Sequence, residues 1–189
     1  MTTVSIIGSG NMGTAIGGLV TDGGNVVEFI ERSGSSITGD VVVLAVPHAA
    51  LDDVLATYGD QLSGKVVVDI TNPVDFASFD GLVVPAQSSA AAEIAAIVPS
   101  AKVLKAFNTT FGATLAKKKV GDAPTTVLIA GDDEDAKALL AAVVSAGGIK
   151  AIDAGGLKRA RELEAIGFLQ ITLAATEKIG WTDGFAVIS

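Results

Sequence analysis

The chain has 189 residues, no cysteine and a formal net charge of −8, and 49% of its residues are hydrophobic. This length and composition fit one ordinary domain, and the lack of cysteine excludes disulfides, thiolate metal ligands and cysteine nucleophiles. The acidic balance argues against a nucleic-acid partner, and without a long apolar run or a basic leader at Met1 we expect no membrane partner and a cytoplasmic location.

The first thirteen residues predict a strand, a glycine turn and a helix. The apolar run Val4–Ile7 leads directly into Gly8–Gly13, whose sequence is Gly-Ser-Gly-Asn-Met-Gly. In a dinucleotide-binding turn, the first glycine permits a sharp bend, the second lets a pyrophosphate approach the main chain, and the third lets the helix pack against the strand. The free N–H groups of the first helical turn then face the phosphates. We favour such a site over a purely structural turn; its residues are Gly8, Ser9, Gly10, Asn11, Met12 and Gly13.

Strand and helix patterns alternate along the rest of the chain. Further strands are expected at 26–30, 40–46, 65–70, 102–107, 125–130 and 149–152. Helices are expected at 11–21, 48–58, 88–98, 133–145 and 157–179. This alternation predicts an α/β fold with a doubly wound, mostly parallel Rossmann sheet, in which ligands bind at the carboxyl ends of the strands.

The connection after the second strand is unusually short. Only residues 33–39 separate it from the next buried strand, and this length cannot hold a helix and a further strand. We therefore expect a sheet that is shortened beside the adenosine pocket. We divide the chain into a dinucleotide-binding domain at 1–153 and a C-terminal helix and tail at 154–189, which pack on that domain or on a second subunit.

The end of the second strand carries the residues that select the cofactor. An acid such as Glu31 normally binds the ribose hydroxyls of NAD, whereas Arg32 suits the 2′-phosphate of NADP. Ser33 adds a donor for that phosphate, so we favour NADP and keep NAD as the alternative. A solvated Glu–Arg pair without a ligand explains the same residues.

Three further strand ends complete the expected crevice. We assign Val46, Pro47 and His48 to the end of the third strand, Thr71 and Asn72 to the end of the fourth, and Phe107 and Asn108 to the end of the fifth. All are expected to contact the dinucleotide because the carboxyl ends of parallel strands meet at one edge of the sheet.

The sequence assigns no catalytic residue but offers four candidates, which are His48, Lys105, Asn108 and Thr109. His48 either contacts the cofactor or donates a proton, although lining the pocket is the simpler role. Lys105 lies in an apolar strand, where an unpaired charge is costly, so we expect it to have a partner. Asn108 and Thr109 offer donors to a substrate or cap the following helix.

Two other patterns are read as structural. The acidic run 132–135 precedes a helix, so we expect it to cap that helix rather than bind a metal. The single histidine and the absence of cysteine also argue against a metal site. Tyr58 is expected in a helix far from the strand ends, which disfavours tyrosine-dependent dehydrogenase chemistry.

Several motifs together resemble one family. They are Gly8–Gly13, Leu-Ala-Val-Pro at 44–47, Val-Val-Asp-Ile-Thr-Asn-Pro at 67–73, Lys-Ala-Phe-Asn-Thr at 105–109, and Asp-Ala-Gly at 153–155 followed by Ala-Arg-Glu-Leu at 160–163. In this order they resemble the NADP-dependent reductases of deazaflavin coenzymes. The N-terminal half is also similar to the Rossmann domain of pyrroline-5-carboxylate reductases and to the reductase domain of the STEAP metalloreductases.

The resemblance implies NADP(H) in the strand-end crevice, with the nicotinamide facing a deazaflavin or flavin ring. It implies the following contacts: Ser9, Asn11 and Met12 on the pyrophosphate, Arg32 on the 2′-phosphate, Pro47 and His48 beside the ribose, and 107–109 at the nicotinamide. It also implies a homodimer through the C-terminal helix.

We therefore expect an NAD(P)H-dependent oxidoreductase that transfers hydride between NADP(H) and a planar small-molecule acceptor. Two alternatives stay open. One is a reductase of a small imine or carbonyl substrate, which needs a proton donor such as His48, Lys105 or Thr109. The other is a dinucleotide-sensing module without turnover.

Overall fold

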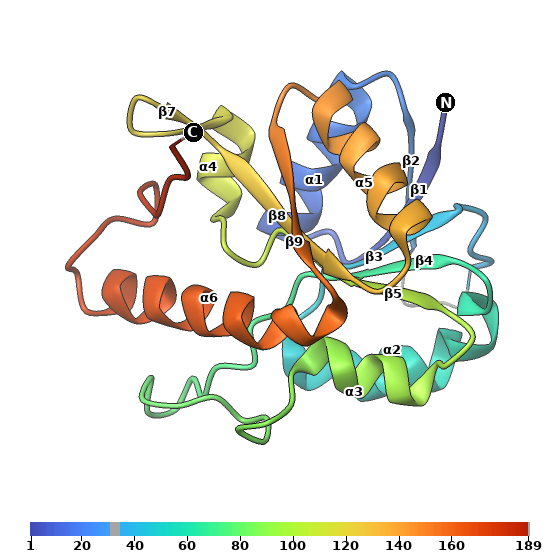
Figure 1. Cartoon of the computed structure of the whole chain (residues 1–189), viewed down its shortest axis with the longest axis horizontal. Helices are drawn as coiled ribbons and strands as arrows, with labels where there is room; N and C mark the ends of the chain where they lie inside the picture. Colours follow the sequence, from blue (N-terminus) through green and yellow to red (C-terminus); the bar gives the residue numbers. More distant parts are fainter. Residues whose placement is uncertain (31–34, 189) are drawn as a thin grey trace.

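A seven-stranded sheet forms the centre of the protein, between two layers of helices (Figure 1). The computed structural model describes residues 1–30 and 35–188. Its strands are β1 (Thr3–Ile7), β2 (Val26–Ile30), β3 (Val41–Leu44), β4 (Val66–Asp69), β5 (Lys102–Lys105), β8 (Thr126–Gly131) and β9 (Lys150–Gly155), in the order β2-β1-β3-β4-β5-β8-β9. A separate hairpin pairs β6 (Lys119–Val120) with β7 (Ala123–Pro124).

The helices are α1 (Asn11–Asp22), α2 (Leu51–Tyr58), α3 (Ala90–Ile97), α4 (Gly112–Lys117), α5 (Glu134–Ala146) and α6 (Ala160–Ala175). Short 3-10 turns occupy His48–Ala50, Gly59–Leu62 and Leu157–Arg159. In the part of the chain that the structure describes, no helix is long and apolar enough to cross a membrane.

The predicted doubly wound, mostly parallel sheet is confirmed. β1 to β5 are parallel, and β3 and β4 are buried on both faces because helices cover each side. β8 is antiparallel to β5, so the last two strands run against the first five. β2 forms the edge of the sheet beside β1, as the short connection after it predicts.

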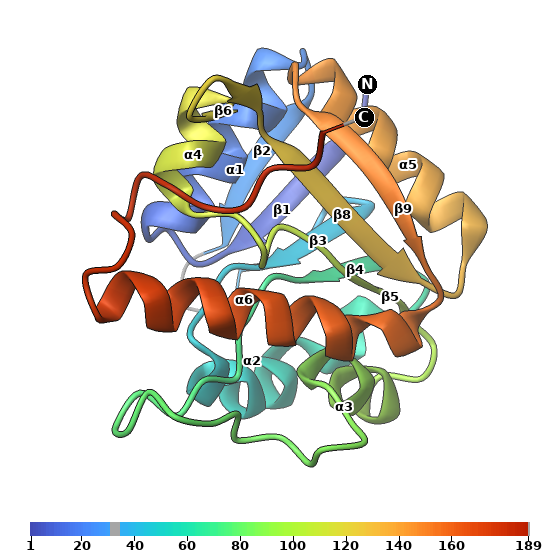
Figure 2. The same ribbon diagram turned by 60° about the vertical axis from the view of Figure 1, so that its left-hand side comes forward.

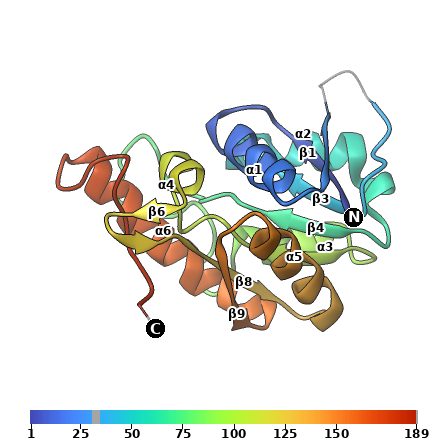
Figure 3. The ribbon, with the colours of Figure 1, turned by 90° about the horizontal axis from the view of Figure 1, so that it is seen from above.

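Each face of the sheet has its own hydrophobic core. α1, α4 and α5 pack on one face, which Figure 3 shows from above, and α2 and α3 pack on the other (Figure 1). The helix expected at 133–145 is confirmed: Asp133 caps α5, and its carboxylate accepts a hydrogen bond of 2.8 Å from the N–H of Ala136.

The C-terminal elements differ from their expected bounds. The last strand, expected at 149–152, is β9 and continues three residues further, to Gly155. The long helix expected at 157–179 begins instead with a 3-10 turn at Leu157–Arg159, and α6 ends at Ala175. Two residues after this end, Glu177 takes a left-handed conformation with φ of 59°. The residues beyond α6 form a tail that turns back toward the side of the molecule that carries α4 (Figure 2).

A buried charge cluster attaches α6 to the sheet. The Lys105 ammonium lies 2.7 Å from a carboxylate oxygen of Asp69 on β4 and 2.7 Å from one of Glu164 on α6, and all three side chains are inaccessible to solvent. Lys105 also donates a hydrogen bond to the carbonyl of Thr71, and the second oxygen of Glu164 accepts one from the N–H of Ala90 at the start of α3. The partner expected for Lys105 is thus a pair of carboxylates.

The cluster contains two carboxyl groups and one ammonium group. Burial raises the pKa of the Glu164 carboxyl, and the positive charge of Lys105 opposes this effect without cancelling it. The raised pKa favours the neutral form of Glu164, which leaves Lys105 and Asp69 as one pair of opposite charges.

We expect the Lys105→Met variant to be about 3–5 kcal/mol less stable than the wild type, because it leaves two buried carboxyl groups without their cation. Urea unfolding followed by circular dichroism measures the change. The control is Lys102→Met, which removes a lysine of the same strand whose ion pair with Asp133 is largely exposed, and which should have a much smaller effect. Equal losses in the two variants would contradict the role of the cluster.

The Glu164 carboxyl should also make stability depend on pH. Its folded pKa is raised above the unfolded value of 4.5, so the folded state holds a proton that the unfolded state has lost. Stability from this group is therefore complete below pH 4.5 and is lost as pH rises through the folded pKa. We expect Glu164→Gln to lack this fall, and urea midpoints of both proteins measured from pH 5 to 8 give the difference. If the difference in urea midpoint between the wild type and Glu164→Gln stays the same across this pH range, Glu164 has an ordinary pKa and the prediction is wrong.

Candidate functional site

The glycine turn has the geometry that its sequence predicts. Gly8 has φ of 108°, and a Cβ there would overlap the carbonyl oxygen of Ala45. A Cβ at Gly13 would overlap the carbonyl oxygen of Gly8, so the third glycine allows α1 to lie against the turn. A Cβ at Gly10, in contrast, would meet no atom within 4 Å. The middle glycine therefore faces open space, where a ligand can approach the backbone.

The N-terminus of α1 is available to an anion. Gly10 is the N-cap residue, no side chain caps the helix, and no acidic residue lies in its first turn. The first backbone bond into the helix is donated by Thr14 to the carbonyl of Gly10 at 2.9 Å. The N–H groups of Asn11, Met12 and Gly13 precede that bond, so the helix itself gives them no acceptor.

Two hollows meet at this turn, and Ser9 and Gly10 line both. The first, which we call the α4 hollow, has a volume of about 900 Å³ and lies between the turn, α1, α4 and the C-terminal tail. The second, the α2 hollow, has a volume of about 860 Å³ and lies between the turn, the ends of β2 and β3, and α2. Together they give a dinucleotide one hollow for each half on either side of the glycine turn.

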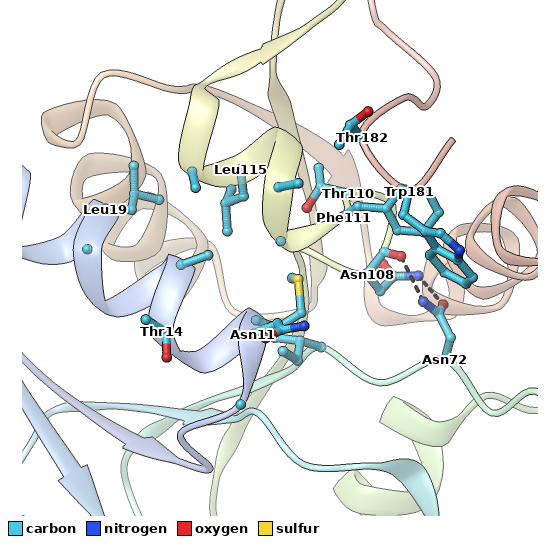
Figure 4. A pocket seen from close by; sticks show the side chains of 18 of the residues that line it. Asn11, Thr14, Leu19, Asn72, Asn108, Thr110, Phe111, Leu115, Trp181 and Thr182 are labelled. Atoms are coloured by element: carbon cyan, nitrogen blue, oxygen red, sulfur yellow. Dashed lines mark hydrogen bonds between the residues drawn. The ribbon is translucent and has the colours of Figure 1, made fainter. Parts of the chain in front are cut away.

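A pair of asparagines lies at one end of the α4 hollow (Figure 4). The Asn108 side-chain amide donates to Asn72 Oδ1 at 2.9 Å and to the carbonyl of Leu163 in α6 at 2.8 Å. Asn72 Nδ2 donates in return to the backbone carbonyl of Asn108 at 2.8 Å. The pair joins the chain after β4, the chain after β5 and α6, so its position is fixed from three sides.

Two buried oxygen atoms of this region have no hydrogen-bond partner in the protein. They are Asn108 Oδ1 and Thr71 Oγ1, both in residues that are 4% exposed. A buried polar atom without a partner is costly, and a ligand is one explanation for it. The two donor bonds of Asn108 fix which of its amide atoms is the oxygen, so Asn108 presents an acceptor.

The structure divides the expected cofactor residues other than His48 into four groups. Ser9, Gly10, Asn11, Met12, Asn72 and Asn108 line the α4 hollow. Gly8, Ser9, Gly10, Val46 and Pro47 line the α2 hollow. Gly13, Thr71 and Phe107 are buried beside these hollows, and the Phe107 ring belongs to the core between α1, α4 and the sheet. Glu31, Arg32 and Ser33 lie outside the described residues.

The catalytic candidates are not brought together. His48 lines a separate small depression between α2 and α3, so the expectation that it faces the crevice does not match its position; the 3-10 turn after Pro47 carries it to that side. Lys105 is fully buried in its charge cluster. Thr109 is buried, and Asn108 alone of the four lines the α4 hollow.

Tyr58 corrects another expectation, because it lies closer to the strand ends than the sequence suggests. It is 3% exposed and lines the α2 hollow together with Phe29 and Ile30 at the end of β2.

Sequence reasoning missed the aromatic residues of the α4 hollow, which are Phe76, Phe111 and Trp181. They come from connections and from the tail, where no strand or helix period marks them. It also missed Glu164, because Arg161 and Glu162 precede it in α6 and no local pattern sets it apart from these exposed charged residues. Among residues 1–30 and 35–188, no group of three acidic or histidine side chains could hold a metal ion.

Comparison with known proteins shows that the chain is similar to members of one family of NADP-dependent oxidoreductases. Residues 33–73 match the family model described as "NADP oxidoreductase coenzyme F420-dependent". The F420-dependent NADP reductase of Methanocaldococcus jannaschii is 31% identical over 148 residues, which are 76% of this chain and 66% of that protein. That of Methanothermobacter marburgensis is 31% identical over 170 residues, which are 82% of this chain and 75% of that protein.

Two other similarities are more limited. Metalloreductase STEAP3 of Rattus norvegicus is 35% identical over 140 residues, but this chain spans only 27% of its length. A crystal structure from Arthrobacter sp. FB24, provisionally named an F420-dependent NADP-reductase, superposes with a TM-score of 0.84 over 100% of both chains at 23% identity. At this identity the likeness shows the fold alone.

Proposed function

Because the chain belongs to the family of F420-dependent NADP oxidoreductases, we propose that it transfers hydride between NADP(H) and a planar acceptor such as a deazaflavin or flavin. One observation carries the proposal: the open backbone at Gly10 lies at the uncapped start of α1, between two hollows of similar volume. This arrangement suits a ligand that has a pyrophosphate in its middle and a ring system at each end.

In this proposal the pyrophosphate accepts hydrogen bonds from the first N–H groups of α1. The helix dipole adds partial positive charge there, which matters in a protein of net charge −8. The adenosine half occupies the α2 hollow, beside Val46 and Pro47. The nicotinamide half enters the α4 hollow, where its carboxamide N–H group can donate to Asn108 Oδ1.

The bound cofactor supplies a hydride, which is two electrons with one proton, from C4 of its reduced nicotinamide. The chain's own contribution is to hold two rings in contact, since positioning alone can supply a large part of the rate enhancement. A planar acceptor can take a further proton from water. It therefore needs no acid from the protein, in agreement with the positions of His48 and Lys105.

The imine or carbonyl alternative has less support from these positions. It requires a proton donor at the acceptor. Of its three candidates, His48 lies between α2 and α3, Lys105 is held by two carboxylates, and Thr109 is buried and does not line the α4 hollow. The sensing alternative predicts cofactor binding without turnover on any acceptor.

The proposal also includes a cofactor preference and an oligomeric state. Preference for NADP over NAD depends on Arg32 and Ser33 outweighing Glu31. A homodimer through α6 is favoured by its half-exposed apolar residue Leu169 and by Ile166 beside it.

Calorimetric titration with NADPH and NADH, each alone, tests the proposal. We expect NADPH to bind more tightly than NADH, and Gly10→Ala to bind NADPH at least tenfold more weakly because its methyl group occupies the place of the pyrophosphate. The variant should keep its melting temperature, since the new Cβ meets nothing in the protein.

The matched control is Gly81→Ala, which also adds a methyl group in open space but at a residue that lines neither hollow. It should bind NADPH as the wild type does. If the wild type binds neither nucleotide, the glycine turn has only a structural role and the proposal is wrong. NADPH binding without reduction of deazaflavin, riboflavin or a ferric chelate would favour the sensing alternative.

A further inference from the structure

Trp181 and Phe111 form an aromatic wall at the asparagine end of the α4 hollow. Their ring centroids are 5.1 Å apart with planes inclined by 52°, and both residues line the hollow. Figure 4 shows the indole over the Asn72–Asn108 pair. Trp181 is the only tryptophan of the chain, yet it is 55% exposed. A large ring that is left open on one side toward a hollow offers a stacking surface.

The tail that carries Trp181 is held in place by polar contacts. Gln170 on α6 is 1% exposed, and its side-chain oxygen accepts a hydrogen bond of 3.2 Å from the N–H of Phe185. Within the tail, the carboxylate of Asp183 accepts a bond of 2.7 Å from the N–H of Gly180, next to Trp181. The bond from Phe185 to Gln170 attaches the tail to α6, and the bond from Gly180 to Asp183 closes the turn that contains Trp181 and Thr182.

The α4 hollow is larger than a nicotinamide ring requires. Its volume of about 900 Å³ lies near the upper end of the range for pockets that bury a complete small ligand. The glycine turn, with Asn11 and Met12, forms one wall, and the aromatic residues form another. Space for a second flat ring system therefore lies between the aromatic wall and the place proposed for the nicotinamide.

We propose that Trp181, supported by Phe111, is the residue that positions the acceptor, by stacking on the flat face of its conjugated ring. The inference rests on the proposed function and adds to it the residue that holds the planar fused-ring acceptor. The indole supplies contact area and orientation but no acid or base. Its loss should therefore affect the binding of the acceptor and leave the binding of NADPH unchanged.

The fluorescence of the single tryptophan reports directly on this contact. We would titrate the complete wild-type protein with 5-deazariboflavin and with riboflavin, which carry the ring without a phosphate, in the presence of NADP⁺. We expect saturable quenching of Trp181, with N-acetyltryptophanamide as the control for absorption by the ring. Quenching equal to that of this control would overturn the proposal.

Variants separate a positioning role from a structural one. Trp181→Ala should weaken acceptor binding, measured by the fluorescence anisotropy of the ring, about tenfold or more and raise its KM correspondingly. Its Kd for NADPH by calorimetry should change less than twofold. Trp181→Phe, which keeps a flat ring, should restore most of the acceptor affinity.

The matched control is Phe185→Ala, which removes an exposed ring from the same tail but outside the hollow and should change neither affinity. Trp181→Ala with wild-type acceptor affinity would overturn the inference and leave the proposed function intact. Equal losses for acceptor and NADPH would show a merely structural role. Failure of the wild type to bind NADPH would instead refute the proposed function.

Discussion

The buried ion cluster of Lys105, Asp69 and Glu164 is the interaction on which the rest of the site depends. Three ionisable groups without access to water would destabilise the fold if their geometry were poor, because each has lost its hydration. Their short contacts therefore fix β4, β5 and α6 relative to one another. Through its second oxygen, Glu164 also fixes the start of α3.

The position of α6 then determines the floor of the α4 hollow. Leu163 precedes Glu164, and its carbonyl accepts a hydrogen bond from Asn108. Asn108 in turn holds Asn72, and Gly167 one turn later allows α6 to approach both of them, because a Cβ there would overlap the Asn72 side chain. The charge cluster and the asparagine pair thus both attach α6 to the ends of β4 and β5.

Much of this arrangement could be predicted from local patterns. The β-α-β alternation, the glycine turn and the cap of α5 depend on residues close together in sequence, and the need of Lys105 for a partner follows from its apolar strand. The identity of its partners could not be predicted, because Asp69 and Glu164 are distant in sequence from Lys105 and contact it only in the folded structure. The antiparallel direction of β8 could not be predicted either, because a buried strand has the same apolar pattern in both directions.

The aromatic wall was also beyond sequence reasoning, because Trp181 lies in an irregular tail and Phe111 in a loop. The positions of His48 and Tyr58 depend on how the turn after Pro47 and the end of α2 pack. The part that sequence reasoning does supply is the glycine turn, whose shape is set by steric limits on each glycine. The site therefore combines a glycine turn, whose conformation follows from the local sequence, with surrounding residues that are brought to it by tertiary packing.

A crystal structure of the protein with NADP⁺ and 5-deazariboflavin tests this arrangement most directly. We expect the pyrophosphate at Gly10 and the first N–H groups of α1, adenosine in the α2 hollow, and the nicotinamide carboxamide within hydrogen-bond distance of Asn108 Oδ1. A nucleotide bound elsewhere, or bound with its nicotinamide outside the α4 hollow, would contradict it.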